Sequence, residues 1–317
     1  MQLMVTGSFY PIAAAAAVSV IFGLSFIFTK DILGYLSPFQ LLGMRFALAA
    51  LSLTALWALR LIRLNIKARH LPALLKIAVW QPGLYFIFET YGVKLTSASE
   101  SGVVIALAPM AVMLLSIFML GERITGGQVV CVAAAVSGVV LMALDGAGAS
   151  GGGGGHLLGL LMLFGAVIAA AFYSIYSRQA ASSFAPLEIT FVMMWLGALV
   201  FNAVGISQSI LDGQLAGYYN ALQHIPVLAG LAYLGLLSSV GAFFLLNFSL
   251  SRLPASRVAV FLNLIPVVSL LAGVTFYGER LGISQLAGCG LILLGVWGTN
   301  FFTVKTAAKA PAGKSFS

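Results

Sequence analysis

The chain has 317 residues, of which 61% are hydrophobic and 8% are charged, and its formal net charge is +8. About a quarter of the residues in a soluble domain are charged, so this chain lacks the polar side chains to cover a globular surface in water. The composition therefore predicts a polytopic membrane protein. The positive net charge does not indicate nucleic acid as a partner, because the basic residues lie in loops between apolar segments.

Ten continuous apolar segments of about twenty residues follow one another, which is the length that an α-helix needs to cross a bilayer. The strands of a membrane barrel would be about ten residues long and would alternate in polarity. The first segment is too long for a signal peptide, and no Lys or Arg precedes it. The sequence thus predicts an all-α protein with ten transmembrane helices, at residues 9–29, 37–59, 73–93, 98–120, 125–144, 157–177, 187–211, 227–250, 254–277 and 283–304.

The basic residues orient these segments. With the N-terminus in the cytoplasm, eleven Lys and Arg residues lie on the cytoplasmic side and three lie outside. Cytoplasmic loops carry the excess of Lys and Arg in membrane proteins. We therefore expect a multi-pass protein of the cell (inner) membrane with both termini in the cytoplasm. The three outside residues are Lys30, Lys94 and Arg280.

An internal repeat divides the chain. The tripeptide Gly-Glu-Arg occurs at 121–123 and again at 278–280, a shift of 157 positions. The same shift places Ala98-Ser99 on Ala255-Ser256, Pro109 on Pro266, Gln128 on Gln285 and Gly138-Val139 on Gly295-Val296. Because five helices are an odd number, the second repeat enters the membrane from the opposite side, as in many secondary transporters. We expect the Gly-Glu-Arg tripeptides to end a helix and to orient the turn that follows.

These repeats define the predicted domain organisation. Residues 1–144 form the first five-helix repeat and residues 157–304 form the second. A glycine-rich stretch at 145–156 is expected to be a flexible external linker, because it lacks the Gly-Lys-Ser/Thr ending of a phosphate-binding loop. Residues 305–317 form a basic cytoplasmic tail.

The segment "IFGLSFIFTKDILGYLSPFQLLGMRFALAAL" (21–51) resembles the opening of EamA-type members of the drug/metabolite transporter superfamily. The segments at 96–128 and 253–285 resemble the repeated hairpin of that family. The resemblance implies a ten-helix bundle of inverted repeats, alternating access to a central cavity, and export of amino acids or other small metabolites. One position departs from the family pattern, because Phe22 stands before Gly23 where a Trp is usual.

Three ionisable residues within or at the ends of the predicted helices are candidates for a site. A charged group deep in the membrane costs about 2.5–3.5 kcal/mol on insertion scales, so each one needs a reason. Arg45 lies about 10 Å and Glu89 about 7–8 Å from the outer helix ends at 1.5 Å per residue, and Glu100 begins the fourth segment near that level. The three residues are candidates either for a structural ion pair between helices or for substrate binding and proton coupling.

Polar and aromatic residues inside the helices form a second group of candidates. Amide side chains either bind the ammonium or carboxylate group of a substrate or join helices by hydrogen bonds, and aromatic residues either line a cavity or pack. The predicted substrate-binding set is Trp80, Gln81, Tyr85, Glu89, Tyr173, Trp195, Asn247 and Asn263. Prolines remove a backbone donor and break helices, so Pro82, Pro109 and Pro266 are the predicted helix breaks.

We expect a secondary transporter that exports amino acids or related zwitterions by alternating access, as a monomer or homodimer, with no metal and no cofactor. A flippase or a transporter of lipid-linked or sugar-type substrates is the alternative within transport. A polytopic membrane enzyme is the alternative outside it, and the sequence argues against that class. The three histidines, His70, His156 and His224, lie in loops or at helix ends, and the chain contains no metal-binding motif such as HExxH.

Overall fold

The computed structural model describes residues 2–66, 70–120, 125–149, 153–180, 183–213, 220–253, 258, 261–279 and 282–309. All regular secondary structure in these ranges is helical. The elements of the first half are α1 (Gln2–Ile32), α2 (Pro38–Ala58), α3 (Leu71–Ala78), η2 (Val79–Leu84), α4 (Tyr85–Leu95), α5 (Ala98–Ile105), α6 (Ala108–Leu120) and α7 (Gly126–Ala149). Those of the second half are α8 (Gly153–Ala180), α9 (Pro186–Leu211), η3 (Ala221–Gln223), α11 (Ile225–Ala232), η4 (Tyr233–Ala242), α12 (Phe243–Arg252), α14 (Ile265–Tyr277) and α15 (Ile283–Lys309).

Six helical stretches among the described residues are long and apolar enough to cross a membrane. They are Tyr10–Ile32, Pro38–Ala58, Leu71–Leu95, Gly155–Ser177, Pro186–Leu211 and Ile225–Arg252. Four shorter apolar helices accompany them, at Ala98–Val112, Gly126–Leu141, Ile265–Tyr277 and Ile283–Gly298. The fold is therefore that of an all-helical polytopic membrane protein, and within the described residues six long and four shorter apolar helices overlap the predicted segments.

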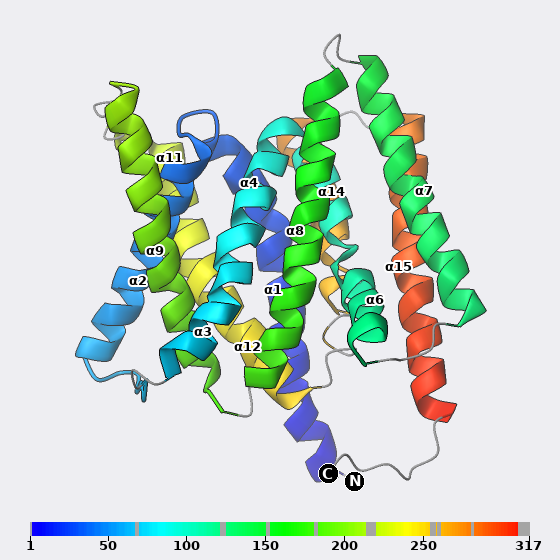
Figure 1. The fold of residues 1–317 in the computed structure, drawn as a ribbon, viewed down its shortest axis with the longest axis horizontal. Coiled ribbons are helices and arrows are strands. Elements are labelled where there is room, and N and C mark those ends of the chain that lie inside the picture. The colour runs from blue at the N-terminus through cyan, green and yellow to red at the C-terminus, as the bar shows by residue number, and fades with distance from the viewer. Residues whose placement is uncertain are drawn as a thin grey trace.

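The helices run alternately up and down the bundle (Figure 1). The beginning of α1 and the end of α15 lie at the lower end of Figure 1, and α7 and α8 meet at the opposite, upper end. The glycine-rich stretch between these two helices differs from the expected flexible linker. Residues 145–149 still belong to α7 and residues 153–156 to α8, because a helix satisfies the backbone hydrogen bonds that an extended linker leaves to solvent.

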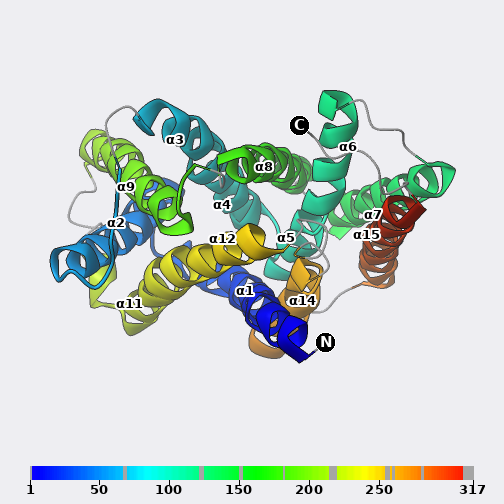
Figure 2. The same ribbon diagram turned by 90° about the horizontal axis from the view of Figure 1, so that it is seen from below.

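Two buried apolar clusters fill the bundle. The first is centred on α2, α3, α9, α11 and α12, and the second on α5, α7, α14 and α15. Helices α1, α4 and α8 contribute residues to both clusters, and the view from below shows α1, α4 and α8 between the two groups (Figure 2). Helices α1, α4 and α8 therefore form the boundary between the two clusters.

The pair α7 and α15 packs closely at one side of the bundle (Figures 1 and 2). A methyl group on Gly138 would lie 2.5 Å from the Gly288 carbonyl oxygen, and one on Gly295 would lie 2.5 Å from the Cys131 carbonyl oxygen. Small residues allow helix backbones to approach in this way in membranes. Gly138 and Gly295 are mates at the shift of 157, as are Cys131 and Gly288, so the two contacts are the same contact made twice by antiparallel helices.

Candidate functional site

A small cavity lies where the two apolar clusters meet. Its polar lining residues are Ser25, Arg45, Gln81, Tyr85 and Glu89, and its apolar lining residues are Phe22, Phe26, Phe86, Ile105, Phe243 and Ile265. These side chains come from both halves of the chain. The space for water molecules is about 40 Å³, which is room for about three molecules at 10–15 Å³ each. The cavity is therefore too small to hold an amino acid.

Arg45 of α2 is 1% exposed and lines this cavity. Its Nε donates a hydrogen bond to Ser239 Oγ at 2.8 Å, and its Nη2 donates to Ser238 Oγ at 3.0 Å. The guanidinium carbon lies 4.5 Å from the centroid of the Phe86 ring, within the range of a cation–π contact. The two neighbouring serines belong to η4, a π-helical segment, and together they hold the guanidinium in position; π-helical segments often occur at functional sites.

Glu89 of α4 is 2% exposed and lines the same cavity. Thr90 Oγ1 donates to its carboxylate at a long distance of 3.4 Å. Within the described part of the chain, no ion pair or hydrogen bond joins Glu89 to Arg45. The direct Arg45–Glu89 pair considered from the sequence is therefore not formed, because the guanidinium is held by the η4 serines instead. Two opposite charges face one cavity without contacting each other.

The break in the third predicted helix places Gln81 at the cavity. The backbone of Gln81 is extended, with φ −147° and ψ 117°, because a residue that precedes proline is disfavoured in the helical region. Pro82 follows it inside η2, and α4 resumes at Tyr85. The interruption therefore turns the Gln81 side chain and, one turn later, Tyr85 towards the same space that Glu89 lines.

The other two prolines also lie at interruptions. Helix α5 ends at Ile105 and α6 begins at Ala108, next to Pro109. Pro266 occupies the first turn of α14. Ile105 and Ile265, which stand at these interruptions, both line the cavity. Three helix irregularities thus surround the site, which is where backbone polar groups inside a membrane are tolerated.

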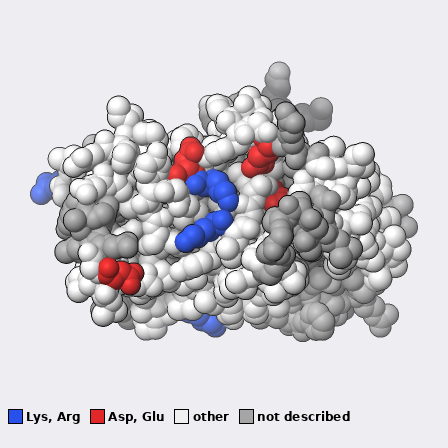
Figure 3. All heavy atoms as spheres, turned by 90° about the horizontal axis from the view of Figure 1, so that it is seen from above, with Lys and Arg blue, Asp and Glu red and all other residues white. Residues whose placement is uncertain are grey.

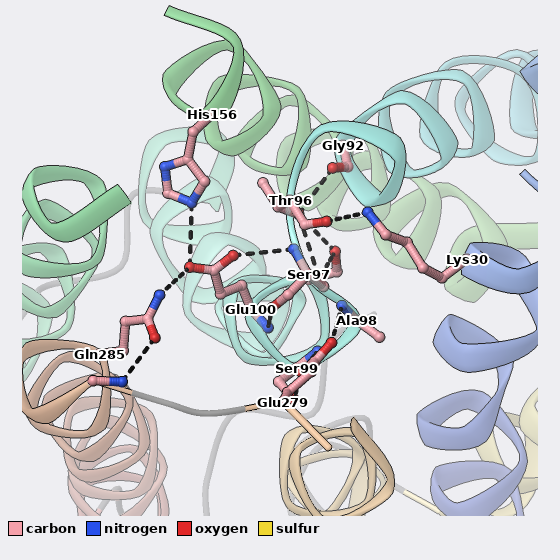
Figure 4. A network of polar contacts seen from close by, with 12 residues as sticks. Lys30, Gly92, Thr96, Ser97, Ala98, Ser99, Glu100, His156, Glu279 and Gln285 are labelled. Carbon is pink, nitrogen blue, oxygen red and sulfur yellow. Dashed lines mark hydrogen bonds and ion pairs between the residues drawn. The ribbon is translucent and has the colours of Figure 1, made fainter. Parts of the chain in front are cut away.

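Glu100 does not line the cavity and instead makes contacts between helices. It lies in the first turn of α5, where its Oε2 accepts a hydrogen bond from Ser97 N at 3.0 Å and closes a capping box. Its Oε1 accepts from Gln285 Nε2 at 3.1 Å and lies 3.2 Å from His156 Nε2 (Figure 4). The capping geometry fixes the carboxylate at the upper end of the bundle, so Glu100 connects the beginnings of α5, α8 and α15.

Five other predicted binding residues do not line the cavity. Asn247 accepts from Tyr173 OH at 3.2 Å and donates to Thr190 Oγ1 at 3.1 Å, which joins α12 to α8 and α9. Trp195 Nε1 donates to Thr54 Oγ1 at 3.0 Å, and Trp80 stacks on Phe172 with ring centroids 4.1 Å apart. These contacts correspond to the helix-joining and packing interpretations.

Asn263 precedes α14 in a part of the chain of which residues 259 and 260 are not described. Its Oδ1 is buried and has no hydrogen-bond partner among the described residues. Among the described residues, the Asn263 Oδ1 atom therefore has no hydrogen-bond partner, and Asn263 is not part of the cavity lining.

The sequence analysis missed several residues of the site. Ser238 and Ser239, which hold Arg45, were not singled out, although they are the repeat mates of Gln81 and Pro82 at the shift of 157. The repeat alignment, which places them opposite Gln81 and Pro82, is the signal that could have identified them. Phe22, the departure from the family pattern, lines the cavity together with Phe26, Phe86 and Phe243, so aromatic packing is retained around the charges.

Comparisons with known proteins agree with these features. The sequence model of the EamA-like transporter family matches residues 9–144 and again residues 157–301. The chain is 31% identical to the uncharacterized transporter YcxC of Bacillus subtilis over 90% of this chain and 91% of that protein. A crystal structure at 20% identity superimposes with a TM-score of 0.60 over 93% of this chain and 98% of that chain, and it shows the fold alone.

More distant relatives carry a named activity. The probable amino-acid metabolite efflux pump of Escherichia coli is 26% identical over 89% of this chain and 92% of that protein. The probable terminal-alkyne amino-acid exporter of Streptantibioticus cattleyicolor is 25% identical over 73% of each chain. These names describe what those proteins export.

Proposed function

The chain belongs to the EamA-like transporter family, and from that premise we propose that it exports amino acids or related zwitterions across the cell membrane by alternating access. The observation that carries the proposal is the placement of Arg45 and Glu89 at one cavity without direct contact. Charges inside a membrane are costly unless they are paired or bind a substrate. A zwitterion would supply a carboxylate for Arg45 and an ammonium group for Glu89.

The chemistry of each side chain favours this assignment. The planar guanidinium of arginine matches a carboxylate and forms two parallel hydrogen bonds with it. The Glu89 carboxylate accepts hydrogen bonds from an ammonium group, and the Gln81 amide lies beside it in the lining. The phenylalanine rings around them offer an apolar wall for the remainder of the substrate. The names of two relatives, both amino-acid exporters by description, support the same substrate class.

The size of the cavity supports alternating access. Its space of about 40 Å³ holds water molecules but not an amino acid, so a substrate enters only when the surrounding helices move apart. Ligand binding then shifts the population towards the state that contacts it better. The breaks at η2, at α5–α6 and at the start of α14 provide places where helix segments change direction.

The proposal includes an inverted repeat. Residues 1–144 and 157–304 would form the two five-helix repeats, joined at 145–156 and followed by the tail at 305–317, which makes ten helices with both termini in the cytoplasm. The paired glycine contacts between the antiparallel helices α7 and α15 support this arrangement. So does the position of the α7–α8 junction at the end opposite to the start of α1 (Figure 1).

Reporter fusions test this topology. A reporter fused at Gly153 is expected outside, and one fused after Ser317 is expected in the cytoplasm, because basic residues are concentrated at the loops on the cytoplasmic side. Paired reporters that are active on opposite sides measure each location independently. If both fusions report from the same side of the membrane, the inverted repeat is excluded.

Counterflow in proteoliposomes tests the substrate. Vesicles that contain the purified protein and a high concentration of one unlabelled amino acid are expected to accumulate the labelled form transiently. Vesicles without protein provide the control. If no amino acid exchanges while an anionic sugar or a lipid-linked sugar does, the zwitterion assignment is wrong and the alternative substrate class takes its place.

A further inference from the structure

The upper end of the bundle holds a ring of polar side chains that the substrate site does not use. Basic and acidic side chains gather near the centre of this face (Figure 3), and Figure 4 shows the contacts of several of them. We call Lys30, Asp31, Tyr277 and Glu279 the upper ring. Each of the four contacts a helix other than its own, so the ring ties together helices that are separate in sequence.

Lys30 ties α1 to α4. Its Nζ donates hydrogen bonds to the carbonyl oxygens of Val93 at 2.8 Å, of Lys94 at 3.2 Å and of Thr96. These carbonyls belong to the last turn of α4 and the residue after it. The last carbonyls of a helix have no partner within the helix and carry partial negative charge. The ammonium of Lys30 therefore caps the C-terminus of α4 from a neighbouring helix.

Glu279 ties the end of α14 to α5. Its carboxylate accepts hydrogen bonds from Ala98 N at 3.2 Å, from Ser99 N at 3.4 Å and from Ser99 Oγ. These groups form the first turn of α5, where backbone donors are unpaired and the helix dipole favours a negative charge. Gly278 ends α14 in the left-handed conformation, with φ 59°, and this turn directs Glu279 back over α5.

Tyr277 and Asp31 complete the ring. The hydroxyl of Tyr277, the last residue of α14, donates to the carboxylate of Asp31 and lies 3.4 Å from the carbonyl oxygen of Ile27. The order of contacts is thus α1 to α4 through Lys30, α4 to α5 through their short turn, α5 to α14 through Glu279, and α14 to α1 through Tyr277. The four helices form a closed circuit at their upper ends.

The same four helices line the cavity. Phe26 of α1, Glu89 of α4, Ile105 of α5 and Ile265 of α14 all face it. Lys30 stands four residues beyond Phe26, about 6 Å along α1, and the end of α4 stands six residues beyond Glu89, about 9 Å, at 1.5 Å per residue. On α1 and α4 the ring therefore lies one to two helical turns above the cavity, and it joins the upper ends of the helices that surround it.

We propose that the upper ring is the outer gate of the transport path, and that Glu279 and Lys30 must leave the ends of α5 and α4 before the cavity opens to the outside. This proposal rests on the proposed function, because a gate needs a path to close. The contacts of Lys30 and Glu279 suit the task, since each places a charge on a helix end, and water and salt can replace that charge when the helices separate. The ring also gives the second Gly-Glu-Arg tripeptide a use, since its Glu caps a helix of the other repeat.

Chemical accessibility of a cysteine in the cavity tests the gate. Ile105→Cys is introduced after Cys131 and Cys289 are changed to Ala, and intact cells are treated with a membrane-impermeant maleimide from outside. We expect slow labelling in this parent. Glu279→Ala and Lys30→Met are expected to raise the labelling rate about tenfold or more, the change in an opening equilibrium that about 1.4 kcal/mol produces.

The matched control is Glu188→Ala. Glu188 also caps a helix, because it accepts from Ala185 N at 2.9 Å and from Asn65 N at 2.8 Å, but it lies in the first turn of α9 at the lower end. Its loss should leave labelling from outside unchanged. If Glu279→Ala and Lys30→Met both fold and both label at the parent rate, the gate is excluded.

Two further results keep the test decisive. If Glu279→Ala does not accumulate, Ser99→Ala is tested in its place, because this change removes one hydrogen-bond donor to Glu279 and keeps the carboxylate. An unchanged labelling rate in Ser99→Ala overturns the proposal, and a faster rate supports it. The assay needs no substrate. Faster labelling without amino-acid counterflow would therefore reject the zwitterion and retain the gate, whereas counterflow with unchanged labelling would reject the gate alone.

Discussion

Replacing Glu89 with glutamine is expected to lower amino-acid counterflow about 10- to 100-fold while the protein still inserts and accumulates. The substitution keeps the size of the side chain and removes its charge, and hydrogen bonds to charged groups contribute about 1.5–3 kcal/mol, which corresponds to this range of affinity. Glu89 forms no ion pair within the described residues. Removing its charge therefore breaks no ion pair with a Lys or Arg side chain there. Counterflow in proteoliposomes of matched protein content measures the effect.

Glu188→Gln is the control for this prediction. Glu188 is also a buried carboxylate, with an exposed fraction of 8%, but it accepts backbone hydrogen bonds at the start of α9 and does not line the cavity. It should transport as the parent does. Transport is compared over a pH range of about 5 to 8. If Glu89→Gln transports as the parent does throughout this range, Glu89 neither binds the substrate nor couples transport to protons. If the variant fails to accumulate, Glu89 supports the fold instead.

The helix positions were predictable because the bilayer imposes them. A chain inside hydrocarbon must satisfy its backbone within helices, so each apolar run of about twenty residues reads directly as a helix. The expected segment 73–93 corresponds to Leu71–Leu95, and its expected interruption at Gln81-Pro82-Gly83 coincides with η2. Proline changes the conformation of its own backbone and of the residue before it, so its effect is local and can be predicted from the sequence.

The partners of the charged residues were not predictable, because they depend on which helices meet. The similar depths of Arg45 and Glu89 along their helices made an ion pair between them plausible. The two serines that hold Arg45, however, lie 193 and 194 positions further along the chain. The second Gly-Glu-Arg tripeptide does end a helix, because Gly278 terminates α14, but the sequence did not show that Glu279 also caps α5. The corresponding Glu122 of the first tripeptide lies outside the described residues.

The glycines of α7 and α15 show what a repeat pattern does reveal. The shift of 157 aligned Gly138 with Gly295 before any contact was known, and a small residue kept at the same place in both halves marks a close approach of backbones. What the pattern did not show is the partner of each glycine. The structure supplies it, because Gly138 meets Gly288 and Gly295 meets Cys131.

Adding a single methyl group at this contact is expected to destabilise the protein. In Gly138→Ala the new methyl carbon would lie 2.5 Å from the Gly288 carbonyl oxygen and 2.9 Å from Ile292 Cγ1, and in Gly295→Ala it would lie 2.5 Å from the Cys131 carbonyl oxygen. The nearest atoms are backbone atoms, so the helices must separate. Overpacking of this kind costs about 1–3 kcal/mol, and thermal unfolding of the detergent-purified variants measures the loss.

Gly290→Ala makes the same chemical change on α15 in open space, because no described residue outside the adjacent part of α15 has an atom within 4 Å of the added methyl group. Alanine is favoured over glycine in a helix by about 0.8–1.0 kcal/mol, so this variant should be as stable as the parent or more stable. The helix preference acts at all three positions, and only the contact differs between them. Equal melting temperatures for Gly138→Ala, Gly295→Ala and Gly290→Ala would therefore mean that α7 and α15 do not approach each other through these glycines.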